Sequence, residues 1–267
     1  MRTRVSLWLA ESPGLVPERM GTGQTMMRYA RLSMGAGALL AVMAMAWPVQ
    51  AGDDNGNVMV RVLGAVIVPD DVKSISSNGV VVPNADADVS TQVIPALTLT
   101  YFVTNNWALE LLCCVSKHQV DGKGPVLGGN GELAETWIFP PIVTLQYHFD
   151  HMGAFKPYVG AGVQYIHFFS EGLGGNNGLG ATSVDFDDAW GFALQGGLDV
   201  SLGDGWYLNA DVKKVWLNTD VTWQNAAGGL GTVVADVDLN PWIISAGIGY
   251  RFNLEDLLGR REAVPLK

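Results

Sequence analysis

One stretch near the end of the chain, Asp236 to Phe252, constrains the fold more than any other. In steps of two, one row of side chains is apolar with an aromatic residue at each end, while the other row is small or polar and ends at Arg251. This period predicts a β-strand with lipid on one face and a lined interior on the other. Because an open sheet edge cannot lie in hydrocarbon, such a strand requires enough similar strands to close a barrel.

Seven earlier stretches show the same period, so we expect an all-β chain folded as an eight-stranded antiparallel up-and-down transmembrane β-barrel. Short turns alternate with long connections, as in bacterial outer-membrane barrels, and we interpret the long connections, including the glycine-rich segment 171–180, as loops. A soluble barrel would need apolar side chains to fill its interior. Here the row of side chains opposite the apolar row is too small, and too charged at one end, to form such a core. The predicted strands are 57–68, 92–103, 107–118, 136–149, 156–169, 187–202, 206–217 and 236–252.

The N-terminal part predicts export from the cytoplasm. Basic residues precede the apolar run Met34 to Trp47, and small residues follow it, which is typical of a secretory signal at 26–51 with cleavage after Ala51. We expect residues 1–25 to be an upstream extension preceding the true translation start. The mature protein would then comprise a barrel over 52–252 and a C-terminal tail over 253–267.

Composition excludes several classes of function. The formal net charge is -10, which disfavours nucleic acid as a partner. The four histidines have no metal-ligand spacing, and we expect no cofactor. Cys113 and Cys114 are adjacent and would point to opposite faces of a strand, so we interpret them as small apolar fillers.

Several segments together resemble the OmpW family across the mature chain. They include LTLTYFVTNNWALELL at 97–112, KPYVGAGVQY at 156–165 and NPWIISAGIGYRF at 240–252. The resemblance implies a barrel of the bacterial outer membrane, surrounded by lipid, that admits small hydrophobic molecules; the alkane-uptake branch typified by AlkL has the same architecture. It also implies contact with the barrel assembly machinery, which reads a terminal aromatic residue, although here the tail 253–267 continues beyond Phe252.

The predicted inner rows divide into two zones. Near the short turns we expect a polar floor of paired charges, since an unpaired buried charge is costly. Near the long connections we expect an apolar funnel. The floor comprises Arg61, Glu110, His148, Asp199, Asp211, Lys213 and Arg251, and the funnel comprises Leu63, Ile67, Ile166, Phe168, Val215, Leu217 and Ile243.

These zones predict a barrel that passes small hydrophobic molecules inward. The floor would stop the solute, so we expect it to leave sideways at a bulge around Pro140 and Pro141. Two alternatives remain open: both zones are only the packed core of a small barrel, or the barrel is a structural or surface-recognition protein that acts through its long acidic loops. We predict no enzyme, because His118 and His167 lack any partner that spacing alone can place beside them.

Overall fold

The computed structural model describes residues 56–257 except 71, 124–130 and 176. The expected upstream extension at 1–25, the signal at 26–51 and tail residues 258–267 lie outside this part. No helix in the described part is long and apolar enough to cross a membrane.

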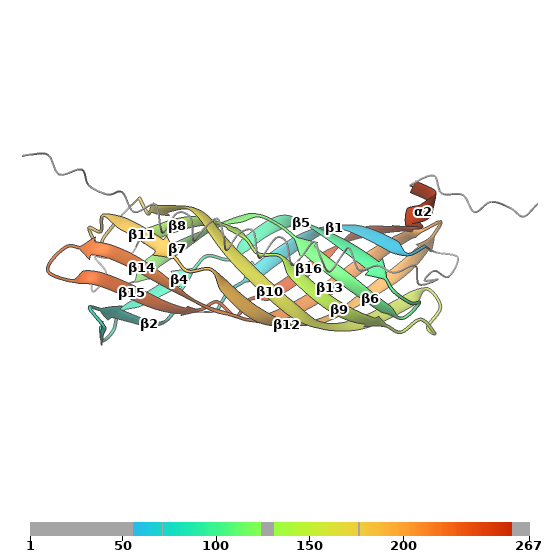
Figure 1. Cartoon of the computed structure of the whole chain (residues 1–267), viewed down its shortest axis with the longest axis horizontal. Helices are drawn as coiled ribbons and strands as arrows, with labels where there is room; N and C mark the ends of the chain where they lie inside the picture. The colour runs from blue at the N-terminus through green and yellow to red at the C-terminus, as the bar shows by residue number, and fades with distance from the viewer. Residues whose placement is uncertain (1–55, 71, 124–130, 176, 258–267) are drawn as a thin grey trace, which may run out of the picture. The chain divides into compact units, whose positions relative to one another are not determined.

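Eight strands form the closed ring that the alternation predicted (Figure 1). Each strand pairs antiparallel with its neighbours, β10 pairs with β12, and the last strand returns to the first. The expected fold is therefore confirmed. In ring order the strands are β1 (Val58–Val68), β5 (Gln92–Phe102), β6 (Trp107–Cys113), β9 (Ile142–His148), β10 (Phe155–Leu173), β12 (Ala189–Gly203), β13 (Trp206–Trp216) and β16 (Trp242–Phe252).

The side chains of β16 alternate between the interior and the outer surface as its sequence predicts. Ile243 and Ser245 are buried, whereas Trp242, Ile244, Ile248 and Tyr250 each expose between 42% and 50% of their surface. Ile244 lies opposite Val66 on β1 and Val212 on β13, so the exposed apolar row continues around the ring. An outward apolar band between aromatic residues is the surface that a lipid bilayer requires.

The four long connections are not simple loops, and our interpretation of them was wrong. They fold into additional strands because they carry enough alternating apolar residues to bury an inner face, and β10 itself runs on to Leu173. The additional strands are β2 (Val72–Ser77), β3 (Val80–Val81), β4 (Asp86–Val89), β7 (Ser116–Lys123), β8 (Gly131–Phe139), β11 (Ser183–Phe186), β14 (Asn218–Ala226) and β15 (Gly231–Asp238).

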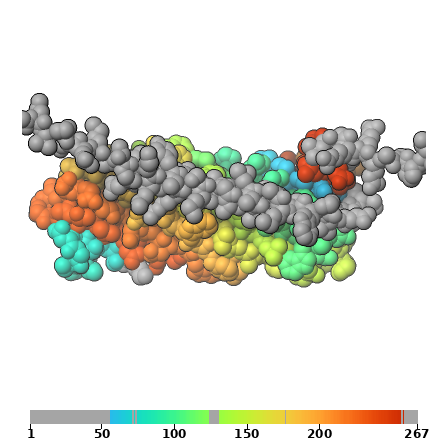
Figure 2. All heavy atoms as spheres, viewed as in Figure 1, coloured from blue at the N-terminus to red at the C-terminus, as the bar shows by residue number. Residues whose placement is uncertain are grey.

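These strands lengthen the barrel on the side of the long connections. β8, β7 and β4 continue the sheet of the ring beyond β10, while β11, β14, β15, β2 and β3 form a second sheet. Figure 2 shows the hairpin of β14 and β15, in orange, at the end of the barrel away from the short turns. Trp223, Leu133 and Leu179 are at most 3% exposed inside this extension, and they belong to the same apolar cluster as the upper part of the ring.

Two predicted strands are divided at one level of the barrel. The segment predicted at 107–118 ends as β6 at Cys113 and resumes as β7 at Ser116, and the segment predicted at 136–149 is split by Pro140 and Pro141. Pairing with β10 keeps one register across the prolines, with Ile142 opposite Gln164 and Phe139 opposite His167. No residue is inserted there, so the expected bulge is wrong and the prolines form an interruption instead.

The chain beyond β16 begins with a short helix. Asn253 follows the last strand, and α2 (Leu254–Leu257) is held to the barrel by the Leu254 amide, which donates to Asn57 Oδ1 at 2.9 Å. The tail does not prevent β16 from completing its pairing with β1 up to Phe252.

Close packing of strand backbones requires glycine at 247. A Cβ at this position would lie 2.0 Å from the carbonyl oxygen of Val62 on the neighbouring strand, whereas a Cβ at Gly64 finds its nearest neighbour at 4.0 Å. We therefore expect Gly247→Ala to prevent barrel formation and Gly64→Ala to permit it. The fraction of unheated protein that migrates as the compact folded band on a gel measures this, and similar folded fractions for both variants would contradict it.

Candidate functional site

Arg61 on β1 is the centre of a buried ionic network in the lower half of the barrel. Its Nη2 and Nε donate to the two carboxylate oxygens of Asp199 at 2.6 and 3.1 Å. Its Nη1 donates to Glu110 Oε2 at 3.0 Å and to Thr100 Oγ1 at 2.6 Å. Arg61 is fully buried, so these four contacts replace the water that its guanidinium loses.

Lys213 extends the network from β13, which is separated from β1 only by β16. Its Nζ lies 2.6 Å from Asp211 Oδ1 and 3.1 Å from Glu110 Oε1. The side-chain amide of Gln195 donates to the same two carboxylates, at 2.7 and 2.9 Å. Two cations and three carboxylates thus share hydrogen bonds with neutral donors, and the network links strands on both sides of the barrel.

His148 and Arg251 lie closer to the short turns than this network does. Arg251 pairs in register with Met59, donates from Nε to the carbonyl of Gly56 at 2.8 Å and lies 3.7 Å from the Phe102 ring centre. His148 stacks on the Tyr158 ring and also contacts the Phe102 ring, which is tilted relative to it. Met59, Phe102, Ala108 and Tyr207 form an apolar cluster at this level. The lower half therefore contains two successive filled layers.

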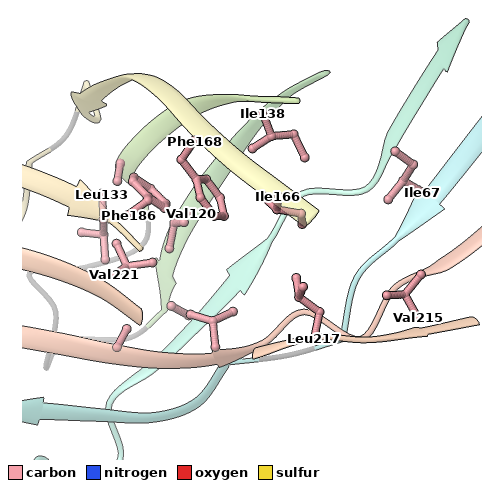
Figure 3. Packing of buried hydrophobic residues seen from close by; sticks show 14 of the residues in the cluster. Ile67, Val120, Leu133, Ile138, Ile166, Phe168, Phe186, Val215, Leu217 and Val221 are labelled. Carbon is pink, nitrogen blue, oxygen red and sulfur yellow. The ribbon is translucent and has the colours of Figure 1, made fainter. Parts of the chain in front are cut away.

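An apolar cavity lies above the network, where the sequence predicted the funnel. Four of the seven predicted residues line it, and the other three, Leu63, Val215 and Leu217, are buried in the surrounding apolar cluster. Figure 3 shows the apolar cluster around it, with Ile138, Ile166 and Phe168 on one side and Leu217 and Val221 on the other. The four lining residues are Ile67, Ile166, Phe168 and Ile243.

The cavity is narrower and more enclosed than an open funnel. Its free volume is about 60 Å³, so a molecule larger than a few waters requires side chains to move. Above it the apolar core continues through Leu133 and Trp223, whose indole Nε1 donates to the Leu133 carbonyl at 3.5 Å. Lining residues such as Phe186, Val221 and Val237 come from the extension. We did not predict them as lining residues from the sequence, because we interpreted most of that region as loops.

The two prolines lie at the wall of this cavity. β6 pairs with β9 up to Leu112 opposite Ile142, and β7 pairs with β8 from Ser116 opposite Ile138. Between these pairs, residues 113–115 and 139–141 have no ladder partners on this side in the described sheet. Both prolines are buried, and Pro140 lines the cavity together with Cys114. The interruption is therefore closed in this conformation.

The structure gives partners to both histidines considered for catalysis, in separate places. His118 lies in the cavity wall, with Nε2 3.0 Å from Ser116 Oγ and Nδ1 3.1 Å from the carbonyl of Ser90. His167 lies beside buried Ile166 and Phe168 on the opposite face of β10, and contacts Asp188 at 3.0 Å. Among the described residues, no group of three or more His, Cys, Asp and Glu could hold a metal ion.

Carboxylates gather on the outer face of the extension. Asp220 on β14 lies directly opposite Asp236 on β15, a like-charged pairing that is unfavourable in a sheet. Partial burial, followed by the charges of Asp236 and Asp187, raises the pKa of Asp220 above its ordinary value. The β14–β15 hairpin thus carries a cluster of like charges on the extension.

Comparison with known proteins gives one consistent result. The model of the OmpW family matches residues 54–252. Outer membrane protein W of Vibrio cholerae is 35% identical, covering 80% of this chain and 96% of its own length. Outer membrane protein AlkL of Ectopseudomonas oleovorans is 32% identical, covering 70% of this chain and 79% of its own. The crystal structure of OprG from Pseudomonas aeruginosa superimposes with a TM-score of 0.70 at 33% identity, covering 76% and 98% of the two chains.

The buried network predicts a large loss of stability when its central cation is removed. Arg61→Met leaves two buried carboxylates without this partner, so we expect a loss of about 3–5 kcal/mol. Lys117→Met removes a surface pair with Glu135, whose side chains are 41% and 35% exposed, and water screening should make that loss much smaller. Urea unfolding in lipid vesicles, followed by the folded band, compares the variants. Equal losses would show that the network stabilises the barrel no more than a surface pair does.

Proposed function

Because the chain belongs to the OmpW family and is a barrel of the bacterial outer membrane, we propose that it passes small hydrophobic molecules inward across that membrane. The observation that carries the proposal is the apolar cavity directly above the ionic network. An apolar molecule that buries about 200 Å² there gains roughly 5 kcal/mol. This exceeds the 1–3 kcal/mol or so that rearranging a packed core typically costs.

The ionic network and the apolar cluster below it make the lower barrel a poor path for such a molecule. Its passage would separate Arg61 from Glu110 and Asp199 without offering polar atoms in exchange. Exit through the wall into the membrane avoids this cost. The interruption at Pro140 and Pro141 supports an exit there, because opening it breaks fewer backbone hydrogen bonds than opening any fully paired seam.

The extension supports access from outside the cell. Short turns of outer-membrane barrels face the periplasm, so the apolar core of the extension leads from the cell surface to the cavity. Side chains fill this route in the present conformation, and admission of a solute therefore requires the extension to move.

One observation favours the alternative that the protein recognises a partner at the cell surface. The facing carboxylates of Asp220 and Asp236 are unfavourable for the sheet itself, and a cationic partner would relieve them. This alternative needs no passage through the barrel, so uptake measurements separate the two proposals. Neither proposal assigns enzymatic activity to the chain.

A charge placed in the cavity should abolish uptake. Phe168→Asp combined with Ile243→Asp puts two carboxylates where the solute would lie, and we expect uptake of radiolabelled naphthalene by expressing cells to fall to that of cells without the protein. Val80→Asp, at a position 70% exposed on β3, is the control and should leave uptake intact. Undiminished uptake by the folded double variant would remove the cavity from the route, and no uptake by the wild type would favour surface recognition.

The interruption provides a separate test of the sideways exit. In an antiparallel ladder the N–H and C=O of one residue point to the same neighbouring strand. The Tyr165 amide donates to the Pro141 carbonyl, so Pro141 faces β10 and Pro140 faces residues 113–115. Pro140→Val restores a donor across the interruption and should slow uptake roughly 2- to 10-fold, the effect of one hydrogen bond.

Pro141→Val is the matched control, because it restores a donor on the intact β10 side. Its uptake should stay close to that of the wild type. Equal uptake by the wild type and both folded variants would indicate that solutes leave elsewhere.

A further inference from the structure

Gln164 is a polar residue in the wall of the apolar cavity. It projects inward from β10 and is 2% exposed. Its Nε2 donates to the carbonyl of Pro140 at 3.5 Å, while Oε1 has no hydrogen-bond partner in the described part of the protein. A buried amide oxygen without a donor is unfavourable, so this site is incomplete as it stands.

The orientation of this amide follows from its neighbour. If the two ends were exchanged, Oε1 would face the Pro140 carbonyl, and two acceptors would oppose each other. The nitrogen therefore takes the position beside Pro140, which leaves the oxygen as the free end.

Other polar side chains around the cavity already have partners. Both ring nitrogens of His118 are engaged, by Ser116 and by the Ser90 carbonyl. Thr136 donates to backbone carbonyls, as does Thr219. Among the residues that the structure describes, no Lys, Arg, Asp or Glu lines the cavity. A ligand that satisfies Gln164 should therefore be neutral, with an apolar body and a hydroxyl or N–H group.

We propose that the cavity selects neutral apolar molecules that carry one hydrogen-bond donor, such as phenols and naphthols, and binds that donor at Gln164 Oε1. This inference rests on the proposed function and narrows its substrate class. The body of the molecule would pack against Ile138, Ile166 and Phe168, which line the same cavity. Because Gln164 also contacts Pro140, the bound donor would lie at the inner side of the interruption.

A pair of probes differing by one donor tests the proposal. 1-Naphthol can donate a hydrogen bond, whereas 1-methoxynaphthalene has the same ring system and no donor. Saturable binding of each to the purified, folded full-length protein in detergent is measured by fluorescence, with correction for partition into micelles. The wild type should bind 1-naphthol about 2- to 10-fold more tightly than 1-methoxynaphthalene, the effect of one hydrogen bond.

Gln164→Met retains the length of the side chain and removes the acceptor, so its ratio of affinities should approach one. Gln119→Met makes the same chemical change on β7 at a residue that does not line the cavity, and should keep the wild-type ratio. A wild-type ratio near one would overturn the inference while leaving the proposed function standing, and so would a preference that persists in Gln164→Met. Absence of saturable binding of both probes by the wild type would overturn both.

Discussion

The constraint on which the structure depends is that backbone groups in hydrocarbon must pair with other backbone groups. The ring satisfies it by closing: β16 returns to β1 in one unbroken register, from Phe252 opposite Val58 to Trp242 opposite Val68. The interruption at Pro140 and Pro141 is an exception, and its residue type limits its cost. Pro140 faces the break and has no N–H, so it leaves no donor of its own unsatisfied there, which helps to explain why the ladder can be broken at this position.

Closure also limits the room inside, because eight strands leave an interior that side chains nearly fill. The lower half is filled by long polar side chains, and small inner residues make space for them. A Cβ at Gly197 would lie 2.3 Å from the Tyr158 ring, whose hydroxyl donates to Asp211 at 2.9 Å. Such a network costs desolvation, and its mutual attraction offsets this cost only because its members also share hydrogen bonds. Under the proposed function, the network would exclude an apolar molecule from this zone.

The strand period was sufficient to predict the ring and the facing of its side chains. Arg61 and Ile243 point inward because a period of two permits only two faces. The contact of Arg61 with Asp199 spans 138 residues and depends on the register of several strands, which the pattern does not encode. The extension was missed although Val221 and Trp223 alternate with polar residues, because flanking Asn and Gly residues indicated a loop. The prolines were assigned to a bulge because sequence alone does not show whether a register shifts.

Along the barrel axis, the interruption lies at the level of the cavity and above the ionic network. On β10, Gly160 lies opposite Gln146 and Gln195 of the polar interior, while Ile166, six residues further along, lines the cavity. At about 3.3 Å a residue, the interior changes from polar to apolar within roughly 20 Å. Pro140 continues this register at the level of Ile166, immediately above Gln164. An opening lower down would expose the ionic network to lipid, and one much higher would lie beside the extension instead of the membrane. For the proposed sideways exit, the level of the prolines would avoid both problems, because Pro140 lines the apolar cavity above the ionic network.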